Sequence, residues 1–119
     1  ALALLDDPVF VDRYTRLALD VADLGTLYAR FVEQVKRGEA LGPDVSMLKA
    51  FATETYSRLA NLLVDIAGAS GATPGDIELD GGSIDVLTTF YNARSATIYG
   101  GSNEVQRNIL AASVLQLPS

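Results

Sequence analysis

The sequence contains no cysteine and no histidine. Without cysteine, the chain can form neither a disulfide framework nor a thiolate site. Without histidine, it cannot build a Ser-His-Asp triad, and it lacks the side chain that most often binds transition metals. We therefore expect no metal site. The lack of disulfides fits a cytoplasmic protein, and we expect that location.

Basic residues and long apolar runs are scarce as well. The chain carries 9 Lys and Arg against 15 Asp and Glu, for a net charge of −6, and its basic residues are scattered. Because binding to a phosphate backbone requires clustered Lys and Arg, we expect no nucleic-acid partner. No apolar run approaches the roughly 18 residues that span a bilayer, so we expect no membrane span. The opening ALALL lacks an initiator methionine and the positive flank of a signal peptide, which points to a processed chain, an engineered piece or a fragment.

The remaining composition suits one folded domain, since 49% of the 119 residues are hydrophobic. Asp7-Pro8 is a good helix start, with an acceptor at the N-cap and proline at the first helical position. Apolar or aromatic residues then recur at intervals of four and three, at Phe10, Tyr14, Leu17, Val21, Leu24, Tyr28, Phe31 and Val35. This spacing predicts a helix over residues 8–37 with one apolar face.

A second helix is predicted over residues 43–67, opened by Pro43 and capped by Gly68. Its apolar positions follow the same spacing, at Val45, Leu48, Ala52, Thr55, Leu59, Leu62 and Ile66. Two long helices joined by a short loop should pack antiparallel, with these two stripes facing each other. A coiled coil would also explain the stripe of the first helix, but packing within a bundle is favoured.

Two shorter helices are predicted over residues 83–96 and 102–115. No β-type alternation of any length and no internal repeat are present in the sequence. These patterns predict an all-α fold, an up-and-down four-helix bundle.

The break between the second and third predicted helices contains a possible calcium loop. Asp76, Glu78 and Asp80 lie at the spacing of its first ligands. The twelfth position of such a loop should be a bidentate Glu, but it is Leu87 here. We therefore expect a solvated acidic loop in place of a calcium site.

Residues 97–108, TIYGGSNEVQRN, place two glycines directly before a predicted helix. Glycine permits a positive φ, and Ser102 or Asn103 can cap the next helix, so an ordinary helix–helix turn explains the pattern. A ligand site explains it equally well. Glycines let a ligand approach the backbone, and free N–H groups at a helix start favour phosphate or another electron-rich group.

The stretch ARSATIYGGSNEVQRNILAASVLQLP, residues 93–118, resembles the C-terminal end of acyl-CoA dehydrogenases. Members of that family carry TIYGGTNEIQRNIIA, followed by a short helix and a Leu-Pro ending. The two long helices predicted upstream resemble those of the same domain, particularly in actinobacterial members. The resemblance implies that residues 1–119 are the C-terminal helical domain of a much longer acyl-CoA dehydrogenase, apparently without the first helix of that domain.

The resemblance also implies the residues of a cofactor site. In the family, the Gly-Gly turn lies beside FAD and the acyl thioester. Carried over by motif, the expected flavin contacts are Gly100, Gly101, Ser102 and Glu104. Gly68 is a further expected flavin contact, from a second motif that is degraded here because Asp65 and Ala69 replace a glutamine and a glycine.

The family's reaction is the α,β-dehydrogenation of an acyl-CoA, in which a carboxylate removes the α proton and a hydride passes to the flavin. Many members hold that glutamate where this chain has Gly100, so we expect no catalytic residue here. The base could lie on an absent segment or on a partner subunit of a hetero-oligomer. A stand-alone, non-catalytic interaction module is the alternative.

The partners implied are the acyl-CoA substrate, the missing N-terminal domains and further subunits of a homo- or hetero-oligomeric dimer or tetramer. Without them, apolar surface on the second faces of the long helices should face water. The candidates are Val9, Leu27, Val32, Phe51 and Leu63. We therefore expect the isolated chain to self-associate and to hold no FAD.

Overall fold

The computed structural model describes residues 2–79 and 81–118, and four main helices dominate it. They are α2 (Pro8–Lys36), α3 (Ser46–Ala67), α4 (Val86–Ala96) and α5 (Asn103–Ile109). The shorter elements are the helical turn α1 (Leu2–Leu5), the 3-10 turns η1 (Pro43–Val45) and η2 (Gly68–Ala72), the strands β1 (Ile77–Leu79) and β2 (Gly82–Ile84), and the π turn η3 (Leu110–Val114). The predicted helical class and its four main helices are confirmed.

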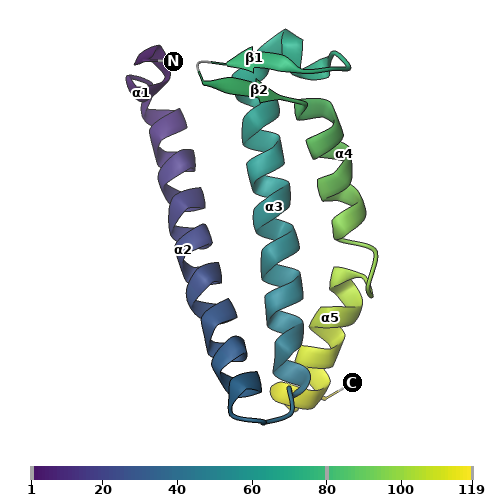
Figure 1. The fold of residues 1–119 in the computed structure, drawn as a ribbon. Helices are drawn as coiled ribbons and strands as arrows, with labels where there is room; N and C mark the ends of the chain where they lie inside the picture. The colour runs from purple at the N-terminus through teal and green to yellow at the C-terminus, as the bar shows by residue number, and fades with distance from the viewer. Residues whose placement is uncertain (1, 80, 119) are drawn as a thin grey trace.

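The main helices stand in three columns (Figure 1). α3 is the middle column and runs antiparallel to α2, to which a short connection joins it. α4 and α5 follow one another along the other side of α3 and together make the third column. α3 therefore contacts each of the other main helices and organises the fold.

The first column begins as the sequence predicts. Asp7 caps α2, since its Oδ1 accepts a hydrogen bond from the Val9 N–H at 2.9 Å. Pro8 occupies the first helical position, where no partner for a backbone N–H is needed. The helix ends at Lys36, next to the predicted end.

The buried face of α2 differs from the predicted one. Leu17 and Phe31 are buried, but more than half of each side chain is exposed at Tyr14, Val21, Tyr28 and Val35. The off-stripe residues Leu27, Val32, Phe51 and Leu63 are half-buried, and only Val9 of that set is exposed. The reason is that α2 packs mainly against α3, which covers one flank of its broad apolar face and leaves the other flank open.

The core continues on the other side of α3, where small residues line its contact with α4. Ala60, Ala93 and Ala96 are at most 2% exposed, and the Ser57 hydroxyl donates to the Ala93 carbonyl oxygen at 3.3 Å. Small side chains allow the two helices to lie close together. The stripe predicted for the second helix misses this side, because it assumes one neighbouring helix and α3 has neighbours on two sides.

The segment after α3 is more ordered than the predicted acidic loop. β1 and β2 form an antiparallel hairpin in which Ile77 pairs with Ile84 and Leu79 with Gly82. The predicted helix start at Ser83 is wrong, because Ser83 lies in β2 and α4 begins at Val86. Strands of three residues are too short to produce a visible alternation, so the sequence pattern does not reveal them.

Much apolar surface remains open. The radius of gyration is 17.4 Å, and the extents are 46 × 27 × 24 Å. A compact domain of this length would have a radius of gyration of about 13.5 Å. A shallow groove of about 480 Å³ lies between α2 and α3 and is lined by Val21, Leu24, Gly25, Tyr28, Leu48 and Ala52. The helices thus form an elongated layer with an open apolar side.

Asp85 holds the start of α4 through a contact that depends on pH. Its Oδ1 accepts a hydrogen bond from the Thr88 N–H at 2.9 Å, and its Oδ2 accepts one from the Thr88 hydroxyl at 2.7 Å. Both bonds hold the pKa of Asp85 below its ordinary value, and the bond from the Thr88 backbone has the larger effect. The stabilisation is therefore complete above the unfolded-state pKa of about 4, and it is lost as the pH falls through the lower folded-state pKa.

We expect Asp85→Ala to lower the Tm at neutral pH, and Asp85→Asn to lower it less, because asparagine is also a good N-cap. The difference between the wild type and Asp85→Ala should shrink in acid, since a protonated Asp85 loses its advantage as an acceptor. Thermal unfolding followed by circular dichroism at neutral and strongly acidic pH measures both effects. Asp6→Ala, at an exposed position, is the control. A difference in Tm between the wild type and Asp85→Ala that stays the same in acid would contradict the role of the carboxylate.

Candidate functional site

The two adjacent glycines form an exposed turn between α4 and α5. Gly100 and Gly101 have φ angles of +68° and +89°, in the left-handed region that side chains disfavour. A Cβ on Gly100 would meet no atom within 4 Å, whereas a Cβ on Gly101 would lie 2.7 Å from Gln106 Nε2. The backbone of Gly100 therefore borders open space and is accessible to a ligand.

A buried polar contact closes the base of this turn. Asn103, the first residue of α5, is 4% exposed, and its backbone N–H donates to the Thr97 carbonyl oxygen at 3.0 Å. From α3, the Lys49 ammonium donates to Asn103 Oδ1 at 2.8 Å and to the Thr97 carbonyl oxygen at 3.3 Å. The residues on either side of the turn are thus joined to each other and to α3.

Two further residues of α3 complete the hydrogen bonds of Asn103. Its Nδ2 donates to Thr53 Oγ1 at 3.0 Å and to Glu54 Oε1 at 3.2 Å. Glu54 also forms an ion pair with Arg107, one turn further along α5. Both ends of the Asn103 amide therefore have partners, as a buried polar side chain requires.

Ser102 and Glu104 follow the glycines and carry the polar groups at this end of α5. Ser102 is the N-cap, and its Oγ accepts a hydrogen bond from the Val105 N–H at 3.4 Å. Glu104 is exposed, and hydrogen bonds from its own backbone N–H and then from the Ser102 hydroxyl hold its pKa below the ordinary value. Glu104 is therefore an anion at neutral pH that accepts hydrogen bonds and donates none.

The two carboxylates beside the turn do not suit the role of a general base. A base that removes a weakly acidic carbon-bound proton needs a raised pKa. The pKa of Glu104 is shifted in the opposite direction. Glu54 is engaged by Arg107 and by the amide of Asn103.

The start of α5 does not offer the free N–H groups that a ligand site at the helix start would need. α5 has seven residues, and the N–H of Asn103 is bonded to Thr97. Ser102 accepts from the next groups, through its hydroxyl from Val105 and through its carbonyl oxygen from Gln106. The interpretation as a phosphate-binding helix start is therefore not supported, while the glycine turn itself remains accessible.

Gly68 lies far from the turn. It follows the C-terminal end of α3 with a φ angle of +56°, whereas Lys49 holds the turn near the start of α3. The rise of the helix from residue 49 to residue 68 is about 28 Å. Beside Gly68, Asp65 forms an ion pair with Arg13 at 2.6 Å. Within this chain, the structure does not bring Gly68 into the same site as the other predicted flavin contacts.

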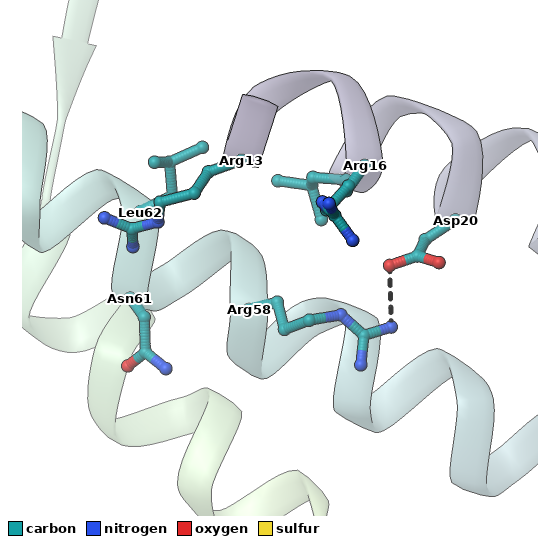
Figure 2. A pocket seen from close by; sticks show the side chains of 7 residues that line it. Arg13, Arg16, Asp20, Arg58, Asn61 and Leu62 are labelled. Carbon is teal, nitrogen blue, oxygen red and sulfur yellow. Dashed lines mark ion pairs between the residues drawn. The ribbon is translucent and has the colours of Figure 1, made fainter. Parts of the chain in front are cut away.

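A hollow of about 180 Å³ between α2 and α3 contains three arginines (Figure 2). Arg58 pairs with Asp20 at 2.9 Å across the two helices, as Figure 2 shows. Figure 2 does not draw the partners of the other two arginines: Arg13 pairs with Asp65 at 2.6 Å, and Arg16 pairs with Asp12 at 2.9 Å. Because each guanidinium has a carboxylate partner, the cluster has no excess positive charge with which to attract an anion.

Two of the three candidate ligands of the possible calcium loop lie in the described part of the chain. Asp76 and Glu78 are exposed, and Asp76 accepts a hydrogen bond from the Ser83 hydroxyl at 3.3 Å. Asp80 lies outside the described residues. Across residues 2–79 and 81–118, no three carboxylates lie close enough together to hold a metal ion. In the same part of the chain, no helix has both the length and the apolar character needed to cross a membrane.

Sequence reasoning finds the glycine turn but misses the residues that hold it. Lys49, Thr53 and Glu54 resemble solvated positions on an otherwise apolar helix. Lys49 and Thr53, four residues apart, nevertheless lie on one face of α3, and this polar pair is the signal that the sequence contains. Their partner Asn103 cannot be recognised as buried from the sequence, because its burial depends on how α5 docks.

Comparison with known proteins identifies the family. Residues 2–115 match the family described as "Acyl-CoA dehydrogenase, C-terminal domain". Two curated relatives are both named "Acyl-CoA dehydrogenase IpdE1". The one from Mycobacterium tuberculosis is 37% identical over 98% of this chain and 29% of its own length. The one from Mycolicibacterium smegmatis is 42% identical over 53% of this chain and 15% of its own length.

A solved structure named "Tcur3481-Tcur3483 steroid ACAD" has a similar fold, with a TM-score of 0.79 and 25% identity over 98% of this chain and 30% of that chain. A structure of its variant matches with the same TM-score. The chain thus spans less than a third of the length of these relatives. Because the family match covers nearly all of its residues, the chain belongs to the acyl-CoA dehydrogenase family and corresponds to the C-terminal domain.

Proposed function

We propose that the chain acts as the C-terminal helical domain of an FAD-dependent acyl-CoA dehydrogenase, without the first helix of that domain. In this role it contributes contacts to FAD and surface for assembly, and the reaction is the α,β-dehydrogenation of an acyl-CoA thioester. The observation that carries the proposal is the exposed Gly100-Gly101 turn, which lies within the residues that match the family. A hydrogen bond from Lys49 to Asn103, next to the turn, joins it to α3.

The residues of the turn suit a flavin. A flat ring can approach the Gly100 backbone closely, because no side chain and no neighbouring atom fills the space beside it. Ser102 and Glu104 offer oxygens that can accept hydrogen bonds from ring N–H groups or ribityl hydroxyls. Gly100, Gly101, Ser102 and Glu104 would hold the cofactor, and bound FAD would supply the acceptor for the hydride.

The proposal assigns the catalytic base to a part of the enzyme outside these 119 residues. In this chain, Gly100 occupies the family position that often carries the glutamate. Glu104, one helical turn further on, does not suit the role of the base, because its pKa is lowered. A segment preceding residue 1 or a partner subunit is the source that we propose.

The relatives suggest a substrate class and an assembly. The name of the solved relative pairs two proteins and denotes a steroid enzyme. On that likeness we propose an acyl-CoA with a steroid-derived acyl group as substrate, and assembly with a second, different subunit. A homo-oligomer is the alternative. The cytoplasm remains the proposed location, on the ground that the sequence lacks cysteine.

A non-catalytic module or subunit is the second candidate function. The observation that favours it is the ion pair of Asp65 with Arg13, which occupies a side chain in the degraded second motif. A long open reading frame upstream of residue 1 would favour the dehydrogenase, and a start codon directly before residue 1 would favour the module.

In the full dehydrogenase, we expect Gly101→Val to reduce FAD occupancy. A β-branched side chain at this positive φ costs about 1–2 kcal/mol and obstructs the approach of the flavin to the backbone. Gly100→Glu should place a carboxylate in the open space beside the flavin. Flavin absorbance relative to protein absorbance after purification measures the occupancy of each variant.

Gly38→Val is the matched control. Gly38 has a φ of +75°, a Cβ added to it would meet no atom within 4 Å, and it lies just beyond the end of α2. The substitution should lower stability to a similar degree and retain FAD. If Gly101→Val keeps as much FAD as Gly38→Val, the turn does not line the cofactor.

The isolated chain should self-associate and hold no FAD. Covering apolar surface contributes about 25 cal/mol per Å², so a patch of a few hundred Å² favours association by several kcal/mol. The open stripe of α2 is the expected contact, and a two-fold dimer or an exchanged helix would cover it. Tyr28→Lys, within this stripe, should weaken the association, which light scattering at micromolar concentration measures.

Leu19→Lys is the control for this experiment, because Leu19 is equally exposed but lies outside the apolar groove. It should leave the association unchanged. A monomer of 12.6 kDa that also binds FAD would show that the domain is self-sufficient and would contradict the proposal.

A further inference from the structure

The Lys49 ammonium joins three segments of the chain. It extends from α3 to the carbonyl oxygen of Thr97, which caps the end of α4, and to the side chain of Asn103, which begins α5. Lys49 and Asn103 are 54 residues apart in the sequence. The loop that contains the glycine turn, residues 98–102, runs between the two groups that Lys49 binds.

We propose that Lys49 and Asn103 are positioning residues for the flavin contacts of the glycine turn. The inference rests on the proposed function of that turn. Two consecutive glycines can adopt many backbone conformations, so the loop does not select one by itself. Hydrogen bonds at both of its ends restrict the directions in which Gly100 and Ser102 face. A turn that is already in the binding conformation loses less entropy when the cofactor binds, which raises affinity.

The chemistry of the two side chains fits this role. An ammonium has three N–H donors and can serve both acceptors at once. Its positive charge also lies at the carboxyl end of α4, where the helix dipole favours a cation. Asn103 accepts from Lys49 while it donates to Glu54 and Thr53. An aspartate could not replace it, because a second carboxylate would then face Glu54.

The test uses the full dehydrogenase that contains this chain, with the variants Lys49→Met and Asn103→Ala. We expect each to weaken FAD binding about tenfold or more and to change the visible circular dichroism of the flavin that remains bound. Because both variants remove the bond between Lys49 and Asn103, the loss of affinity in the double variant should be smaller than the sum of the two single losses. Lys49→Arg keeps the charge and the donors and should recover most of the affinity.

Three controls separate positioning from a loss of stability. Lys36→Met removes an exposed ammonium that pairs only with Glu33 among the described residues, and Asn108→Ala removes an exposed amide of α5, so both should behave as the wild type. Leu62→Ala destabilises the contact between α2 and α3 without touching the turn. If Leu62→Ala weakens FAD binding as much as Lys49→Met at an equal loss of Tm, the role of Lys49 is only structural and the inference is overturned.

Gly101→Val distinguishes a failure of this inference from a failure of the proposed function. If Gly101→Val also leaves FAD bound, the turn does not line the cofactor and both fail. If Gly101→Val releases FAD while Lys49→Met and Asn103→Ala retain wild-type affinity and spectrum, the positioning inference alone is overturned. Should Asn103→Ala not fold, the comparison of Lys49→Met with Lys49→Arg decides the same question.

Discussion

The position of the Gly100-Gly101 turn depends on one contact, between the Lys49 ammonium and the buried amide of Asn103. A polar side chain is stable in the interior only when its hydrogen bonds are made, and leaving one unmade costs about 1–3 kcal/mol. Asn103 finds its partners in one arrangement of α5 against α3, at Lys49, Thr53 and Glu54. That requirement selects how α5 docks, and the docking in turn holds the glycine turn at the surface.

The rest of the fold is organised around α3, which supports different contacts on its two sides. Toward α4, alanines and a serine allow a close and well-buried contact. Toward α2, larger side chains meet along one flank only, and aromatic and aliphatic residues such as Tyr28 and Val21 face the solvent. An apolar face that broad is typical of a helix with neighbours on two sides. The open flank therefore suits a domain that packs against further structure, as the length of its relatives also suggests.

The main helices could be predicted from the sequence because each depends on local signals. The start of α2 follows from Asp7-Pro8, and the end of α3 follows from Gly68. The buried face of α2 could not be predicted, since periodicity locates an apolar face but not the neighbour that covers part of it. The hairpin could not be predicted either, because its strands have only three residues each.

The candidate site shows the same division. The glycines and the capping residue Ser102 are visible in the sequence, because turns and caps require particular residue types. Lys49 and Asn103 become a pair only when α3 and α5 are packed, and no local pattern records a contact over that separation. The resemblance to acyl-CoA dehydrogenases predicts a flavin at this turn, whereas composition and spacing alone supported an ordinary turn and an unspecified ligand site equally well.

The central claim is that the turn at Gly100 and Gly101 lines a flavin while Lys49 and Asn103 hold it from behind. A crystal structure of the complete protein with FAD bound tests this most directly. We expect the flavin ring in van der Waals contact with the backbone of the turn, Ser102 or Glu104 within hydrogen-bond distance of the cofactor, and the Lys49–Asn103 bond intact. FAD bound elsewhere, with the glycine turn facing solvent or a protein surface, would contradict the claim.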